Sequence, residues 1–295
     1  MVVRTLADLR KEDEQRNRDA ETGEALPLIR AETRSTDSSI SSGGSASVSR
    51  TTALRVLDLL FPYFRLRSLL LLISVADWVV FITTLALDSE MPLVPSIGIL
   101  VTFGANVPPL VARGQVWRLL TASFLHANLL HVAFNVFFQL RMGFGIERRY
   151  GYLKFALLYA AAAIYGNLLS AAALFCGTVK VGASTAGFGM MGVEMAELAL
   201  SWRRLQHRDR LLTNIISFFL LMGLFAFTLN GGYIDQMGHL GGLICGLSLG
   251  FLYNKDMQDK PRWWSFAMWC SVFLLVALPA SCVPVIFAVN RGCTL

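Results

Sequence analysis

From about residue 68 onward, the chain alternates long apolar segments with short polar ones. A helix that crosses a bilayer needs roughly 20 mostly apolar residues, and seven segments approach that length. We place them at residues 68–87, 129–145, 152–174, 184–201, 211–229, 236–253 and 263–289. We expect the second segment to extend upstream of residue 129. The pattern predicts an all-α fold, a polytopic membrane helix bundle.

The region between the first two apolar segments, residues 88–120, contains prolines, glycines and the stretch GQVWRLL. Loops of this length without structure of their own are uncommon in compact domains. We therefore expect a structured insertion that is partly embedded in the membrane.

The N-terminal region differs in kind from the rest. Residues 35–49 read STDSSISSGGSASVS, and such a polar segment buries too little apolar surface to fold alone. The region has no early apolar run, so we expect no cleavable signal peptide. Residues 54–67 are predicted to lie along the membrane surface. The predicted organisation is a disordered tail at 1–66, a six-span core at 67–254, and a linker with the seventh span at 255–295.

Positively charged residues gather in alternate loops, which are expected to face the cytosol. They are Arg65, Arg67, Arg148, Arg149, Lys154, Arg203, Arg204, Arg208, Arg210, Lys255, Lys260 and Arg262. The opposite loops carry fewer, namely Arg113, Arg118, Lys180 and Arg291. We therefore expect a cytosolic N-terminus and a lumenal or extracellular C-terminus.

Composition supports a membrane protein. Of the 295 residues, 55% are hydrophobic and only 16% are charged, and the mean hydropathy is +0.54. Basic cytosolic loops explain the net charge of +6, so no nucleic-acid partner is expected. The five cysteines show no paired spacing, and we expect neither a disulfide framework nor a metal site. No cofactor is expected.

Polar residues within the apolar segments are the candidates for chemistry, because such residues are costly in a membrane. The stretch GASTAGFG places Ser184 at the start of the fourth segment. In the predicted topology the second, fourth and sixth segments all begin at the lumenal side, so His131, Ser184 and His239 lie at similar depth. A serine beside a histidine can form a nucleophile and its general base. A helix N-cap is the alternative role of Ser184.

Small residues favour close contact between the fourth and sixth segments. His239, Gly242 and Gly246 lie on one helical face, and small residues let membrane helices approach each other closely. Phe188, one turn into the fourth segment, is placed to pack against the imidazole. Gly182 allows a sharp turn before that segment begins.

The stretch HANLLHVAFN carries His126, His131 and Asn135. His131 and Asn135 face the same way and can donate hydrogen bonds to an oxyanion, as can the backbone N–H of Ser184 at a positive helix end. A purely structural role between helices is the alternative for both. We expect His126 to be structural. Asp235, four residues before His239, is expected at the loop surface rather than in a triad.

In chain order, the motifs WR, H-x4-H-x3-N, a glycine-rich stretch that reaches Glu147, GAS and GHLGGLICG resemble the rhomboid intramembrane serine proteases. The resemblance covers residues 117–253 and implies a six-span rhomboid core. It makes Ser184 the nucleophile and His239 the base, with His131 and Asn135 lining the oxyanion hole.

The seventh span after the core resembles the eukaryotic secretory-pathway branch of this family. The motif GASTAGFG and the short polar tail are similar to those of apicomplexan rhomboids, whose members trim parasite surface adhesins. The resemblance implies single-span membrane protein substrates, which are cleaved within or near the lumenal end of their transmembrane helix to release ectodomains. It also implies contact with membrane lipid, a Golgi, secretory-organelle or plasma-membrane location, and a supporting role for His126 beside the site.

One position departs from the family pattern G-x-S-G, because Thr185 replaces the second glycine. Threonine is β-branched and stiff, so it could narrow the pocket or add a hydroxyl there. A non-catalytic rhomboid-like protein that binds and escorts transmembrane clients is the alternative function, and the intact Ser184 and His239 argue against it. A transporter would need paired interior charges or internal repeats, and the sequence shows neither.

Overall fold

The computed structural model describes residues 57, 59–174, 176, 178–202, 208–228, 234–258, 260–290 and 293. The chain divides into two units, Met1–Pro62 and Tyr63–Leu295, and the elements described below belong to the second. The predicted tail lies almost entirely outside the described residues, as does the first part of the predicted surface segment. The domain assignment therefore stays a prediction.

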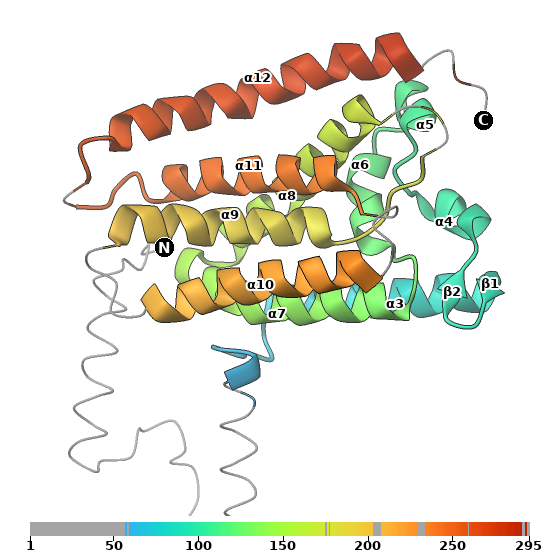
Figure 1. Ribbon diagram of the computed structural model, residues 1–295, viewed down its shortest axis with the longest axis horizontal. Coiled ribbons are helices and arrows are strands. Elements are labelled where there is room, and N and C mark those ends of the chain that lie inside the picture. Colours follow the sequence, from blue (N-terminus) through green and yellow to red (C-terminus); the bar gives the residue numbers. More distant parts are fainter. Residues whose placement is uncertain are drawn as a thin grey trace, which may run out of the picture. The chain divides into compact units, whose positions relative to one another are not determined.

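The long helices of the described residues coincide with the predicted apolar segments. They are α3 (Leu69–Leu87), α7 (Leu129–Tyr150), α8 (Tyr152–Ala173), α9 (Ser184–Ser201), α10 (Arg208–Thr228), α11 (Gln236–Tyr253) and α12 (Trp264–Asn290) (Figure 1). The expected upstream extension of the second segment is wrong. The Oδ1 of Asn128 accepts a hydrogen bond from the N–H of His131 at 2.9 Å, which caps α7 at its first turn.

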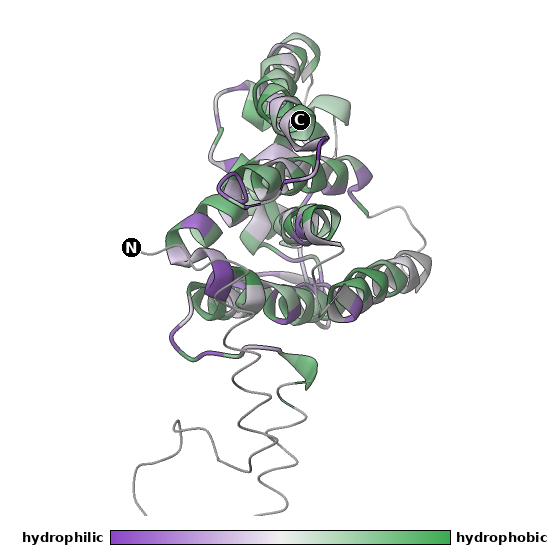
Figure 2. Ribbon diagram, turned by 90° about the vertical axis from the view of Figure 1, so that its left-hand side faces the viewer, coloured by the Kyte–Doolittle hydropathy of each residue, from purple (hydrophilic) through white to green (hydrophobic). Residues whose placement is uncertain are grey.

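Four helices of the described residues are long and apolar enough to cross a membrane, namely Leu69–Leu87, Leu129–Tyr150, Tyr152–Ala173 and Trp264–Val289. Figure 2 shows the helices nearly end-on, with apolar colour along α12 and its neighbours. Phe266, Trp269 and Phe273 of α12 are exposed, as suits side chains that face lipid. The predicted all-α membrane bundle is thus confirmed. Glycine-rich α9 and α11 need less apolar surface because they are largely buried among other helices.

The insertion between α3 and α7 is structured, as predicted. Strands β1 (Ser89–Met91) and β2 (Val94–Pro95) pair antiparallel. They are followed by α4 (Ile97–Phe103), α5 (Pro108–Ala112), α6 (Arg118–Thr121) and the 3-10 helix η2 (Ala122–Phe124). The guanidinium of Arg118 donates to the carbonyl oxygens of Val101 at 2.7 Å and Ala105 at 2.9 Å. These bonds tie α6 to the last turn of α4 and to the loop that follows it.

Glycines bring α9 and α11 into backbone contact. A Cβ atom at Gly246 would overlap the backbone of Gly189, and one at Gly242 would overlap the backbone of Thr185. No hydrophobic driving force holds helices together in lipid, so close packing of this kind stabilises the contact between α9 and α11. It fixes the distance between the helices that carry Ser184 and His239.

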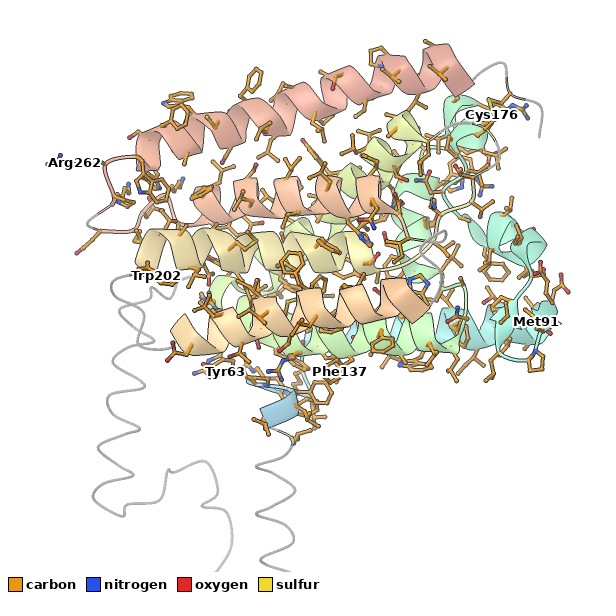
Figure 3. All side chains as sticks on the ribbon, in the orientation of Figure 1. Tyr63, Met91, Phe137, Cys176, Trp202 and Arg262 are labelled. Carbon is orange, nitrogen blue, oxygen red and sulfur yellow. A yellow bond between two sulfur atoms is a disulfide. The ribbon has the colours of Figure 1, made fainter. Side chains whose placement is uncertain are left out.

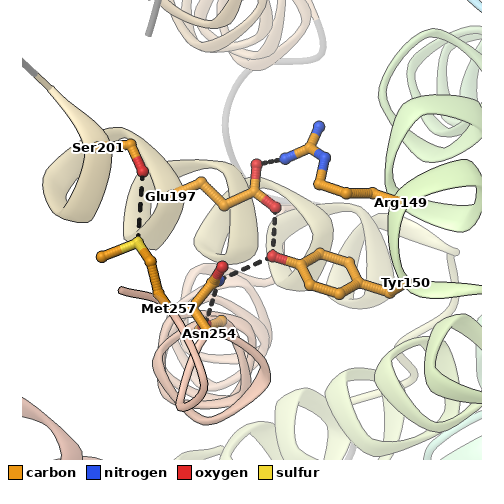
Figure 4. Close-up of polar contacts among 7 residues, drawn as sticks. Arg149, Tyr150, Glu197, Ser201, Asn254 and Met257 are labelled. Carbon is orange, nitrogen blue, oxygen red and sulfur yellow. Dashed lines mark hydrogen bonds and ion pairs between the residues drawn. The ribbon is translucent and has the colours of Figure 1, made fainter. Parts of the chain in front are cut away.

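The ends of α7, α9 and α11 that lie far from Ser184 are joined by partly buried polar contacts (Figure 4). Arg149 pairs with Glu197, which also accepts a hydrogen bond from the hydroxyl of Tyr150. The side-chain amide of Asn254 donates to the same Tyr150 hydroxyl at 2.8 Å. Buried ion pairs contribute little net stability, but they can specify how helices are arranged.

Glu147 contacts the N-terminal end of α3. Its carboxylate accepts hydrogen bonds from the Ser68 hydroxyl at 2.6 Å and from the N–H groups of Leu69 at 2.9 Å and Leu70 at 3.1 Å. A carboxylate at a helix N-terminus satisfies free N–H groups and the helix dipole. This contact holds the start of α3 against α7.

The expectation of no disulfide is wrong. Cys176, after α8, and Cys293, after α12, form a disulfide with Cα atoms 5.7 Å apart. Figure 3 labels Cys176 at the end of the bundle where α12 ends, and Arg262 at the opposite end. The Nη2 of Arg113 donates to the carbonyl oxygen of Cys293 at 3.1 Å. The last described residue is thus held to the loop before α9 and to the insertion.

The disulfide makes a testable prediction about thiol labelling. After denaturation without reduction, we expect a maleimide mass tag to label three of the five cysteines, Cys245, Cys270 and Cys282. Reduction should expose all five. In Cys293→Ser, Cys176 loses its partner, so four tags should attach with or without reduction. Five tags on the unreduced wild-type protein would contradict the disulfide.

Candidate active site

Ser184 is the first residue of α9, and Ala183 occupies the N-cap position without a side-chain capping bond. The Oγ of Ser184 lies 2.8 Å from Nε2 of His239. The hydroxyl is therefore directed at an imidazole instead of capping the helix. This distance suits proton transfer from a nucleophile to a general base.

The imidazole of His239 is held by stacking. Its ring lies parallel to the Phe188 ring, with centroids 4.3 Å apart and an interplanar angle of 16°. Phe188 in turn makes an edge contact with Phe218 of α10 at 4.9 Å. A buried, stacked ring has few orientations open to it, so Nε2 stays directed at Ser184.

Gly182 provides the turn into α9. Its φ is +132°, in a region that side-chain-bearing residues rarely adopt. A Cβ atom here would lie 2.7 Å from Nε2 of His131. The N–H of Gly182 donates to the carbonyl oxygen of Ala122 at 2.9 Å. Glycine is thus required both by the backbone angle and by the imidazole of His131 beside it.

His131 and Asn135 lie on the first turns of α7. The N–H of Ala127 donates to Nδ1 of His131 at 3.4 Å, so the proton of the neutral imidazole is assigned to Nε2, on the side of Gly182. The Asn135 side-chain amide donates to the carbonyl oxygen of His131 at 3.0 Å. This bond uses one of its two amide hydrogens.

The ring of His126 packs against the ring of His131. It is completely buried, and its ring meets the His131 ring edge to face, with centroids 5.2 Å apart. Burial, and to a smaller extent the titratable His131 ring beside it, hold the pKa of His126 well below its ordinary value. A neutral, buried ring of this kind suits a structural role.

Asp235 is the N-cap of α11. Its Oδ1 accepts a hydrogen bond from the N–H of Gly238 at 2.8 Å, and burial raises the pKa of the Asp235 carboxyl. The Asp235 side chain is partly buried, so it is less exposed than the expected position at the loop surface. The hydrogen bond from Gly238 caps the helix and does not join a third member to the Ser184–His239 pair.

Two buried asparagines, to which the sequence motifs do not point, lie between the insertion and α8. The amide of Asn106 donates to the backbone oxygen of Asn167 at 2.9 Å. Asn167 of α8 donates to the carbonyl oxygen of Leu119 at 3.0 Å and to the hydroxyl of Ser123 at 3.2 Å. These bonds hold the insertion to α8. The signal for Asn167 was a polar residue in the middle of an apolar segment.

Thr185 points away from the Ser184 hydroxyl, into the helix interface. Its side chain is only 3% exposed, and its hydroxyl lies 3.4 Å from that of Ser123. Its Cβ and methyl group pack where Gly166 of α8 leaves space. Thr185 is therefore a packing residue in this structure.

Replacing Thr185 with glycine should change stability more than rate. We expect a loss of about 1–2 kcal/mol, because glycine is a poorer helix former and the methyl contact with Gly166 disappears. The rate of cleavage should stay within a few fold. Thermal unfolding and kinetics of Thr185→Gly and of the control Thr185→Ser would measure both. A rise in rate of more than about tenfold would show that Thr185 restricts access to Ser184.

Known proteins resemble this chain over most of its length. A family model described as the Rhomboid domain matches residues 113–256. The chain is 61% identical to Rhomboid-like protease 1 of Toxoplasma gondii over 292 residues, which is 99% of this chain and 97% of the relative. It is 38% identical to Rhomboid-like protease 2 of the same organism over 236 residues, 79% and 82% of the two chains. Rhomboid protease GluP of Bacillus subtilis is 41% identical over 147 residues, 50% of this chain and 28% of that one.

These relatives include apicomplexan and bacterial proteases, and the likeness to the first extends over nearly the whole chain. The family model covers the helices that carry His131, Ser184 and His239. The predicted similarity to apicomplexan rhomboids is confirmed. This integral membrane protein belongs to the rhomboid family of intramembrane proteases.

Proposed function

We propose that this protein is a serine endopeptidase with a Ser184–His239 dyad, which cleaves single-span membrane proteins near the lumenal end of their transmembrane helix. The observation that carries the proposal is the 2.8 Å contact between the Ser184 hydroxyl and Nε2 of His239. Stacking on Phe188 and the glycine contacts of α9 with α11 support it, because they hold both groups in place.

The first step is acylation of the enzyme. His239 accepts the Ser184 proton while Oγ attacks the carbonyl carbon of the scissile bond. The protonated imidazole then gives its proton to the leaving amine, and an acyl-enzyme remains. Water, activated by the same imidazole, hydrolyses the ester and restores the serine. No step in this scheme requires a cofactor.

The oxyanion formed in each attack would be held by hydrogen-bond donors at the start of two helices. The candidates are Nε2–H of His131, the second amide hydrogen of Asn135, and the N–H of Ser184. The first N–H groups of a helix have no partner within it and lie at its positive end. His131 lies beside Gly182, two residues before the nucleophile.

We further propose that the N-terminus is cytosolic and that the site opens toward the lumen of the secretory pathway. The basic loops flank the helix ends that lie far from Ser184, as the positive-inside pattern requires. The Cys176–Cys293 disulfide lies at the Ser184 end, and disulfides persist in oxidising compartments. Both features support the same orientation.

Co-expression with tagged single-span membrane proteins tests the function. We expect release of an ectodomain fragment by the wild-type protein and none by Ser184→Ala at equal abundance. Fragment release that persists in purified Ser184→Ala would contradict a serine protease. Stable co-purification of substrates without Ser184-dependent cleavage would favour the alternative of a non-catalytic escort protein.

A further inference from the structure

Helix α10 lies against α7 and α9 and meets them through a narrow stripe of side chains (Figure 1). Between residues 211 and 220 its buried side chains are those of Leu211, Asn214 and Phe218. Residues at this spacing share one face of a helix. Phe218 is only 2% exposed and lies furthest along the stripe, so its contacts hold this part of α10 against the bundle.

The ring of Phe218 bridges two other helices. It makes an edge contact with Phe138 of α7, with centroids 4.9 Å apart and an interplanar angle of 76°. It makes a second edge contact with Phe188 of α9, at 4.9 Å and 83°. Phe188 in turn stacks on His239 of α11 at 4.3 Å. Edge-to-face and offset-stacked rings attract each other in these specific geometries, so four rings from four helices form one row that ends at the proposed base.

The other end of the row belongs to the helix that carries the candidate oxyanion donors. Phe138 of α7 follows Asn135 by three residues and His131 by seven, so all three lie on one helical face. Phe138 is itself buried. Phe218 therefore joins the helix of the oxyanion donors to the ring on which the base is stacked.

The Phe188 ring depends on Phe218 for its orientation. Phe188 is 8% exposed, and the other α10 ring beside it, Phe219, lies farther away at 6.4 Å. Protein interiors are closely packed, so loss of the Phe218 ring would leave a cavity. Phe188 could turn into that cavity, and the imidazole stacked on it would shift. A shift of about 1 Å at the reacting groups can cost about 100-fold in rate.

We propose that Phe218 is a positioning residue for catalysis, which holds the Phe188 ring and thereby keeps Nε2 of His239 directed at the Ser184 hydroxyl. The inference rests on the proposed protease function and deepens it. Phe218 acts through Phe188 and not by contact with the reacting atoms. The placement of α10 against α7 and α9 therefore helps to set the rate of the chemical step.

The test measures kcat and KM with full-length protein in liposomes and a single-span reporter that the wild-type protein cleaves. Phe218→Ala should lower kcat by about 10–100-fold and change KM by less than about threefold, because the loss affects alignment and not substrate binding. Phe218→Leu keeps most of the buried volume, so it should fold, and it should still lower kcat by about fivefold because it offers no ring to Phe188. The rate at which a fluorophosphonate labels Ser184 should fall in parallel with kcat.

A double variant separates positioning from a general loss of packing. In a Phe188→Ala background, the further change Phe218→Ala should cost less than about twofold in kcat, because the ring through which Phe218 acts is already absent. If Phe218→Ala costs as much in that background as in the wild-type protein, the inference is overturned.

Phe155→Leu is the matched control for Phe218→Leu. Phe155 is a completely buried phenylalanine of α8, and its ring pairs with Tyr159 of the same helix at 6.4 Å. This change should lower the temperature of unfolding in a similar way but leave kcat within about twofold, because additive packing losses at distant sites do not reach the dyad. Equal losses of kcat in the two leucine variants, or wild-type kcat in Phe218→Leu, would overturn the inference. Absence of any Ser184-dependent cleavage by the wild-type protein would instead overturn the protease function.

Discussion

Replacing His239 with alanine is expected to slow cleavage by about 10⁴–10⁶-fold, as much as replacing Ser184. In serine proteases the nucleophile and base act as a unit, so losing either one removes almost the whole effect. The 2.8 Å contact and the stacked Phe188 ring place these two residues in such a unit here. Initial rates of the two single variants and of the double variant Ser184→Ala/His239→Ala would measure it.

The double variant is the decisive comparison. Two residues that act as a unit are strongly non-additive, so the double variant should be no slower than either single one. His239→Gln, which fills more of the space beside Phe188, controls for loss of packing and should also be inactive. If the rate losses of the two single variants multiply in the double variant, another group serves as the base. The same conclusion would follow if His239→Ala kept a rate within tenfold of the wild-type rate.

Removing an oxyanion donor should lower kcat by about 10²–10³-fold and leave folding intact. His131→Ala and Asn135→Ala test the two side-chain donors. His131 should show the larger effect, because its Nε2 lies beside Gly182, whereas Asn135 already gives one amide hydrogen to the His131 carbonyl. Steady-state kinetics would separate kcat from KM, and thermal unfolding would show whether the fold survives.

His131→Gln serves as a control, because it retains a hydrogen-bond donor at a similar distance from the backbone and should recover part of the lost rate. His126→Phe is a second control, since it keeps an aromatic ring against His131 and should affect activity less than His131→Ala. Near-normal kcat in both His131→Ala and Asn135→Ala would show that the oxyanion is held by other groups, such as backbone N–H groups alone.

The helices could be predicted closely because a span is a local property of the sequence. The start and end of α9 and α11 coincide with the predicted segments. The start of α7 at Leu129 coincides with the predicted segment, but the expected extension upstream is wrong, because the Asn128 side chain caps the helix there although apolar residues lie upstream. The juxtaposition of Ser184 and His239 was also foreseeable, because alternate spans enter from the same side and begin at the same depth.

Two other contacts, the disulfide and the Arg149–Glu197 ion pair, could not be predicted from local sequence patterns. Cys176 and Cys293 are 117 residues apart, and ordinary spacing rules for cysteine pairs do not apply to them. The predicted topology already placed both at the lumenal side, which was the only hint. Arg149 and Glu197 belong to different helices, and their pairing depends on how α7 and α9 are rotated toward each other.

By itself, the sequence determined which segments are helical and their order along the chain, and it predicted which polar residues share one end of the bundle. Apolar length, charge asymmetry and glycine positions are enough for that. Only the tertiary structure decided the direction of individual side chains, such as Ser184 toward His239 and Thr185 into the packing with α8. The reason is that lipid and protein interior are both apolar, so hydrophobicity does not specify which face of a membrane helix meets its neighbour. Close packing and a few buried hydrogen bonds make that choice.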